Sequence, residues 1–196
     1  MKYGWLLTQA ASVPMNELWG NGDSLEDGDF YEEIVKKYQS AWSPYQTKIL
    51  TAMQELLGIE FRQSIIDVYV APWFNAFSDP MVFGVMYEPD RFVDVFTHEL
   101  LHRLMTDSKQ LSHDYEIDAD WRRLFGDDHS QNTLIHIPVH AVHKAILLDI
   151  LKEPERYDRE IALTSKWPDY KAAWQYVNAH DYKKIIEDLH KLYKPR

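Results

Sequence analysis

Cysteine is absent from the sequence of 196 residues. This absence excludes disulfide bonds, zinc sites built from thiolates and catalysis by a thiol. Any zinc ion would have to be bound by histidine, aspartate or glutamate side chains. Because cysteine-free proteins occur both inside and outside the cell, the absence carries no information about the compartment.

Positive charge is also scarce. The sequence has 21 lysine and arginine residues against 31 aspartate and glutamate residues, and its formal net charge is −10 at pH 7. A nucleic-acid backbone or an anionic lipid surface would repel such a chain unless a local basic patch offset the charge, and the sequence shows no such patch. We therefore expect neither a nucleic acid nor a membrane as a partner.

Hydrophobic runs are short throughout the sequence. The apolar run at the N-terminus ends at Leu7, which is too short for a signal peptide, and no later run approaches the length needed to cross a membrane. These features predict a cytoplasmic protein.

Glycine and proline form no linker in this chain. There are seven glycines and nine prolines, and no segment rich in Pro, Gly or Ser separates two parts of the sequence. Three of the glycines fall in the acidic segment 16–28, which is predicted to be a mobile loop. Residues 1–196 are expected to form one domain, with a C-terminal helical part over about residues 153–196.

The hydrophobic pattern predicts many helices and two strands. β-branched and aromatic residues dominate segments 65–72 and 81–87, which is typical of strands. Helices are predicted over 30–41, 91–106, 114–125 and 138–151, with three more within 154–192. A small sheet therefore comes directly before the helix at 91–106, and the expected fold class is α+β and rich in helix.

Capping signals predict one further helix and locate the start of the helix at 91–106. Ser43, Pro44 and Gln46 have the spacing of a capping box, which predicts a helix that opens at Ser43 and ends at Gly58. Asp90 is the expected N-cap of the helix at 91–106.

Aromatic residues are abundant, with seven tryptophans and twelve tyrosines. Such a content favours a well-filled core, and it is also compatible with a cleft lined by aromatic rings. Tyr170, Trp174 and Val177 form one apolar stripe of the C-terminal helices. The aromatic segment 72–77 could line a cleft, but packing is its expected role.

Residues 98–102 read His-Glu-Leu-Leu-His, an H-E-x-x-H pentapeptide within the helix predicted at 91–106. Residues four apart on a helix lie one turn above each other, so His98 and His102 can bind the same Zn²⁺. Val95 and Met105 extend the same face, which predicts that it is buried. Buried imidazoles without a partner would be costly, and this favours metal binding over two surface histidines.

A catalytic zinc site needs a third protein ligand. His136, His140 and His143 lie within eight residues of one another. If Pro138 is the first residue of a helix, His140 and His143 share a face of its first two turns, and His136 comes just before it. A helix N-terminus disfavours a protonated imidazole, which helps to keep the ring neutral for a metal. His140 is the preferred third ligand because its small and branched neighbours suit close helix packing, and His136 and His143 remain alternatives.

The pentapeptide on a helix that follows two strands resembles the active-site core of the zincin metallopeptidases. The resemblance covers about residues 65–143 and is specific only at the pentapeptide. It implies a zincin-like domain in which Glu99 is the general base for zinc-activated water and strand 81–87 is the sheet edge that pairs with an extended substrate. The longer metzincin motif is absent, because Met105 and Ser108 occupy its glycine and last histidine positions.

Glu116 is a further candidate for the third ligand. Residues 116–120 have the form E-x-x-A-D and resemble the segment from which gluzincin-type peptidases take a glutamate ligand. Only thirteen residues separate His102 from Glu116, which is short for that group. Stabilisation of the first helical turn by an acidic side chain is the alternative explanation for Glu116.

The sequence therefore predicts a Zn²⁺-dependent hydrolase of the metallopeptidase type that acts on peptides or proteins. Its expected ligands are His98, His102 and His140, and its expected general base is Glu99. The alternative is a binding module without catalysis, built on the same scaffold, with a structural metal or none. The oligomeric state cannot be predicted from the sequence.

Other side chains are candidates for supporting roles. His136, His143 and Tyr115 could stabilise an oxyanion. Asp94 and Asp149 could orient the ligand imidazoles through hydrogen bonds.

Overall fold

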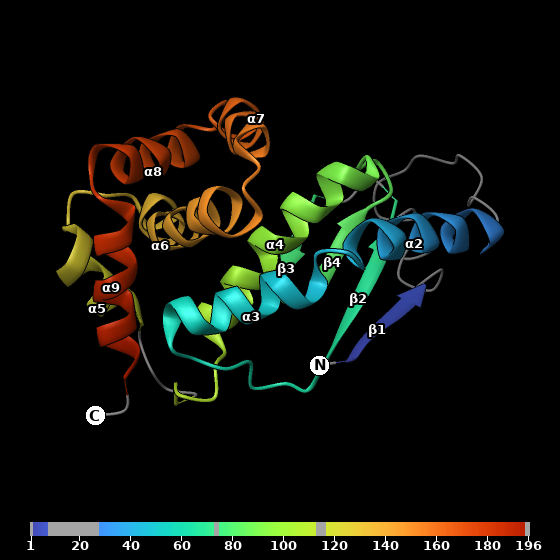
Figure 1. The fold of residues 1–196 in the computed structure, drawn as a ribbon, viewed down its shortest axis with the longest axis horizontal. Helices are drawn as coiled ribbons and strands as arrows, with labels where there is room; N and C mark the ends of the chain where they lie inside the picture. Colours follow the sequence, from blue (N-terminus) through green and yellow to red (C-terminus); the bar gives the residue numbers. More distant parts are fainter. Residues whose placement is uncertain (1, 8–27, 73–74, 113–116, 195–196) are drawn as a thin grey trace. The chain divides into compact units, whose positions relative to one another are not determined.

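The structure is a computed structural model that describes residues 2–7, 28–72, 75–112 and 117–194 (Figure 1). The chain divides into two compact units, one formed by residues 1–46 and 63–99 and the other by residues 47–62 and 100–196. The boundary between Glu99 and Leu100 falls inside α4 (Pro89–Thr106), which is one continuous helix. The expectation that residues 1–196 form a single domain stays a prediction. The segment 16–28, expected as a mobile loop, lies outside the described residues except for Gly28.

The first unit contains a four-stranded sheet with the order β1-β2-β4-β3. Strand β2 (Ile65–Ala71) pairs in parallel with both β1 (Lys2–Leu7) and β4 (Met81–Gly84). Burial alternates along most of β2, as expected for a strand with one face toward a core. The two predicted strands are confirmed, together with the α+β class, whereas β1 and the two-residue β3 (Phe77–Ser78) were not predicted.

The expectation that strand 81–87 forms the sheet edge is wrong. The strand ends at Gly84. Its first two residues, Met81 and Val82, pair with β2 on one side and with β3 on the other. A turn at Asp79 and Pro80 lets β3 fold back onto β4 in antiparallel orientation. Strand β3 therefore occupies the edge of the sheet next to Met81 and Val82.

Aromatic side chains form the core that holds the first part of α4. Tyr38 of α2 (Gly28–Trp42) stacks on Phe92 with ring centroids 4.1 Å apart, and its hydroxyl donates a 2.8 Å hydrogen bond to the Gly84 carbonyl. Phe83 packs edge-on against Phe92 and Phe96. These rings connect α2, β4 and α4 within the first unit.

Two predicted helix starts are wrong. Helix α3 (Gln46–Leu57) begins at Gln46, because the Ser43 N–H donates to Gln39 at the end of α2 and residues 43–45 form a turn. Helix α4 begins at Pro89 rather than after Asp90, since proline suits the first helical position. The predicted end of α3 at Gly58 is confirmed, and Gly58 adopts a φ of +68°.

The second unit consists of helices. After α3 and the last part of α4 come α5 (Ile117–Phe125), α6 (Gln131–Ala145), η1 (Ile146–Leu151), α7 (Pro154–Thr164), α8 (Pro168–Ala179) and α9 (Tyr182–Tyr193). Helix α6 is central to this unit and packs against α5, α8 and α9 (Figure 1). The three predicted C-terminal helices are confirmed, and Trp174 and Val177 are buried as their apolar stripe predicted.

Helix α6 begins seven residues earlier than predicted, at Gln131 instead of Pro138. Ser130 is its N-cap and accepts a hydrogen bond from the Thr133 N–H, so Pro138 lies inside the helix. Consequently His136, His140 and His143 all belong to one helix, and their spacings of four and three residues place them on one face.

Helix α6 and the π-helical turn η1 together form an apolar segment of 21 residues, Gln131–Leu151. By length and composition alone this segment could cross a membrane, which corrects the expectation that no stretch approaches that length. However, 67% of its apolar stretch of 18 residues is buried inside the structure, as in the core helix of a globular unit.

Candidate metal centre

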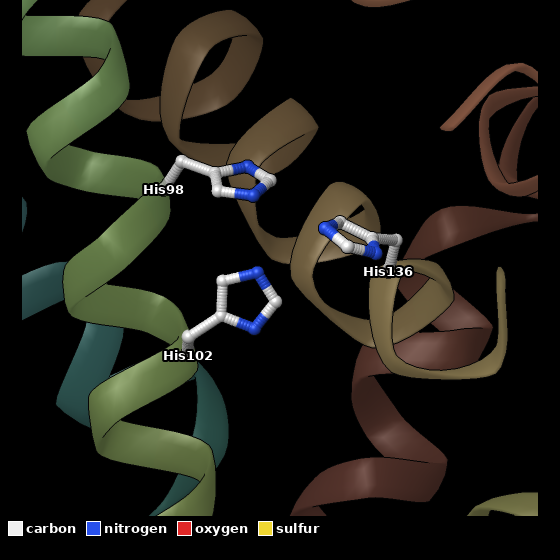
Figure 2. A group of neighbouring side chains, drawn as sticks. All are labelled: His98, His102 and His136. Carbon is white, nitrogen blue, oxygen red and sulfur yellow. The ribbon is translucent and has the colours of Figure 1, made fainter. Parts of the chain in front are cut away.

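Three histidines from α4 and α6 come together. His98 and His102 lie one turn apart on α4, and both rings extend toward the ring of His136 on α6 (Figure 2). One ligand atom from each of the three lies within 4.8 Å of the others. Nitrogen atoms that share a tetrahedral zinc at 2.0–2.1 Å are about 3.3 Å apart, so small side-chain rotations suffice to bring these three onto one ion.

The ring of His136 has a defined hydrogen-bonding state. Its Nδ1 lies 2.6 Å from the carbonyl oxygen of Asn132, one turn earlier in α6. Because a carbonyl oxygen can only accept, Nδ1 carries the proton and donates it. The lone pair is then on Nε2, and such a hydrogen bond to the other ring nitrogen is what usually orients a metal-binding histidine.

Burial keeps the imidazoles of His102 and His136 neutral. Burial, and to a smaller extent the nearby His136, lowers the pKa of His102 from 6.5 to about 3. Burial also lowers the pKa of His136, against the opposing effects of the Asn132 carbonyl and the Asp169 carboxylate. Neutral imidazole is the form that binds a metal ion, so both rings are in the binding form at pH 7.

Glu99 lies between the two histidines in the sequence of α4 and is 8% exposed. Burial raises the pKa of its carboxyl group to about 8. A divalent cation nearby would favour the carboxylate and lower this pKa. The protonation state of Glu99 is therefore coupled to any metal bound beside it.

His140, the ligand preferred from the sequence, has different surroundings. It is fully buried, and its ring stacks on Trp174 of α8 with centroids 3.9 Å apart and an interplanar angle of 10°. Among the described residues, His140 does not belong to either group that could hold a metal. Its role as a ligand stays a prediction, and the structure brings His136 to His98 and His102 instead.

A second group contains His98, His143 and Glu160, all of them buried. Glu160 lies on α7, and sequence reasoning missed it. The one signal in the sequence is the four-residue spacing of Arg156, Glu160 and Thr164, which are the buried residues of α7. A polar stripe on the buried face of a helix indicates a polar partner inside the protein.

The other candidates from the sequence have varied positions. Glu116 and Tyr115 lie outside the described residues. Asp94 is buried and forms a 3.8 Å ion pair with Arg91, while Asp149 accepts a 2.9 Å hydrogen bond from the Tyr182 hydroxyl. Of the described part of the aromatic segment 72–77, Phe77 is 54% exposed and does not pack as expected.

Sequence reasoning also missed the neighbours of His136 on α8. The ring centroids of Tyr170 and His136 are 3.9 Å apart. The apolar pattern of the sequence had assigned Tyr170 only to a packing stripe. Asp169, the residue before it, accepts hydrogen bonds from the side chains of Ser130, Asn132 and Thr133 at the start of α6. These contacts join the first turn of α8 to the turn that precedes His136.

Comparisons of the chain with protein-family models, with curated proteins and with solved structures found no match. The chemistry of the site therefore has to be argued from its own residues.

Proposed function

We propose that this protein is a zinc-dependent hydrolase that cleaves peptide or amide bonds. His98, His102 and His136 hold the ion in this proposal, and Glu99 is the general base. The observation that carries the proposal is the three-histidine group, in which the H-E-x-x-H pair on α4 meets a third imidazole from α6 within 4.8 Å. Three nitrogen ligands with a fourth position left to solvent are the usual set of a catalytic zinc site.

The donor set favours a transition metal such as zinc over the hard cations. Imidazole nitrogen suits zinc, whereas magnesium and calcium prefer oxygen ligands. When bound, zinc lowers the pKa of a water molecule toward 7 and polarises a carbonyl group.

The side chains of this chain supply the proton transfers and the positioning. Glu99, as carboxylate, accepts a proton from the attacking water and returns it to the leaving amine. Asn132 fixes His136 through the hydrogen bond at Nδ1, so that Nε2 stays available. His102 is the least buried of the three histidines.

The experiment that tests the proposal compares the wild-type protein with Glu99→Gln and His102→Ala. The wild type is expected to retain about one zinc ion after dialysis and to hydrolyse peptide substrates. Glu99→Gln should keep the zinc but lose at least about 10²-fold in kcat, because it cannot accept a proton. His102→Ala should lose both. Full activity of Glu99→Gln would overturn the mechanism.

The second candidate function is a binding module with a structural metal. The group of His98, His143 and Glu160 favours it, because all three residues are buried, as the ligands of a structural metal site closed to solvent would be. In that case Glu160→Gln would release the metal and His136→Ala would retain it. The hydrolase proposal expects the reverse for His136→Ala.

A further inference from the structure

Four aromatic rings form a continuous series from the surface of the second unit to the candidate metal centre. The ring centroids of Trp167 and Tyr170 are 5.4 Å apart, those of Tyr170 and His136 are 3.9 Å apart, and those of His136 and His102 are 4.9 Å apart. The outer end of the series is open to solvent, since Trp167 is 47% exposed. The inner end consists of two of the proposed zinc ligands.

The backbone of Trp167 is fixed. Pro168 follows it and restricts it to extended conformations, and Trp167 has φ −92° and ψ 127°. Its N–H donates to the Thr164 carbonyl at 3.1 Å, and its own carbonyl accepts from the Lys171 N–H at 2.9 Å. Because this backbone is already ordered, binding of another group to the indole needs no further ordering of the main chain.

Exposed apolar side chains occur elsewhere among the described residues, but their setting differs. Leu163 on α7 is 42% exposed and Leu124 on α5 is 37% exposed, yet neither is an aromatic ring in the series that ends at the metal centre. Trp167 combines exposure, a fixed backbone and ring contact with Tyr170, which in turn lies against His136.

We propose that Trp167 and Tyr170 form a substrate subsite that takes an aromatic or large aliphatic side chain of a peptide close to the bond that is cleaved. This inference rests on the proposed function. Two ring-to-ring steps separate Trp167 from His136, and an extended peptide spans about 3.3–3.6 Å per residue. The side chain on the subsite therefore belongs to a residue within about three positions of the scissile bond.

The charge at the subsite defines the preference further. The Lys166 ammonium group lies 4.3 Å from the centroid of the Trp167 ring. A lysine or arginine side chain of a substrate would meet this positive charge at the aromatic face, whereas an uncharged ring or aliphatic chain would not. The subsite thus selects apolar side chains over basic ones.

Binding measurements test the subsite separately from catalysis. Zinc-loaded Glu99→Gln protein is titrated into a short labelled peptide of glycine and alanine with one phenylalanine, and into the same peptide with alanine or lysine at that position. Fluorescence polarisation should show about five- to tenfold tighter binding of the phenylalanine peptide. Adding Trp167→Ala should reduce this preference to within about twofold, while Trp167→Phe and the control Leu163→Ala should preserve it.

Each outcome decides one of the two proposals. Equal binding of the three peptides, or a preference that survives Trp167→Ala, overturns the subsite. If the preference depends on Trp167 but the wild type cleaves none of these peptides, the subsite stands and the hydrolase proposal fails. If the wild type cleaves peptides without any preference that depends on Trp167, the hydrolase proposal stands and the subsite fails.

Discussion

His136 and His140 lie one turn apart on α6 and have different chemical surroundings. His136 is held by the Asn132 carbonyl at one nitrogen and belongs to a group that can bind a metal. The ring of His140 packs flat against Trp174 in the interface of α6 and α8. This difference separates a proposed ligand from a residue that stacks on an aromatic ring in the interface of α6 and α8.

The first prediction uses these two histidines as a matched pair. His136→Ala should lower zinc affinity by at least about 10²-fold, because the ion loses one of three protein ligands. His140→Ala should leave zinc affinity within a few-fold but lower the free energy of unfolding by about 2–4 kcal/mol, through the cavity left against Trp174. Competition with a zinc chelator and denaturant unfolding measure the two quantities. A loss of zinc in His140→Ala alone would restore His140 as the ligand.

The second prediction concerns Glu99 in the metal-free protein. Its pKa is raised from 4.5 to about 8 in the folded state, so burial favours the protonated form. The contribution of Glu99 to stability is therefore present below about pH 4.5 and is lost as the pH rises through about 8. Glu99→Gln cannot lose a proton, and its stability relative to the wild type should increase between pH 5 and pH 8.

Denaturant unfolding in the presence of a chelator measures this difference at the two pH values. A difference that stays constant between pH 5 and pH 8 would show that Glu99 is not buried as described. Zinc should reduce the difference, because a cation stabilises the carboxylate.

At the scale of elements, the placement of His136 depends on the N-terminal turn of α6. Ser130 caps the helix, and Asp169 on α8 accepts hydrogen bonds from Ser130, Asn132 and Thr133. The same turn provides the Asn132 carbonyl that orients His136. The contact between α6 and α8 thus positions a proposed ligand without touching the metal.

The third prediction tests this contact with two helix-terminal aspartates. Asp169→Asn should lower zinc affinity several-fold, because the turn that carries Asn132 is held less firmly. Asp181→Asn is the control, since Asp181 caps α9 through the Lys183 N–H and makes no contact with this turn in the described hydrogen bonds. Asp181→Asn should leave the melting temperature nearly unchanged, because asparagine caps a helix as well as aspartate does. Equal zinc affinity of the two variants would contradict a positioning role for Asp169.

Helix α6 also shows why an element start can be misplaced by sequence reasoning. Proline inside a helix costs about 3 kcal/mol, and this cost justified the prediction that Pro138 begins the helix. In the structure, Pro138 lies within a run of buried residues, 136–143, whose packing offsets that cost. Tertiary packing, which local rules do not contain, decided the start and moved His136 onto the helix.

For the whole molecule, local signals predicted the elements better than the contacts between them. Two strands, the H-E-x-x-H helix and the three C-terminal helices follow from hydrophobic period and capping. The third histidine, Glu160 and Tyr170 could not be chosen in this way, because their meeting depends on which helices pack together. One sequence offers several histidines at suitable spacing, and only the packing of α6 distinguishes His136 from His140.

The fourth prediction concerns the stability of the whole molecule. A ligand that binds only the folded state stabilises it by about 2.7 kcal/mol at a hundredfold excess over its Kd. Zinc at such a concentration should therefore raise the melting temperature of the wild type by several degrees, and magnesium should not, because the donors are imidazoles. The shift should disappear in His102→Ala. An equal shift with magnesium would indicate binding to surface carboxylates instead.

X-ray absorption spectroscopy of the zinc-loaded wild type tests whether His98, His102 and His136 hold the ion. We predict three imidazole nitrogens at about 2.0–2.1 Å and one oxygen from solvent, with one imidazole lost in His136→Ala. A spectrum with four protein ligands and no solvent oxygen, or a first coordination shell unchanged by His136→Ala, would contradict it.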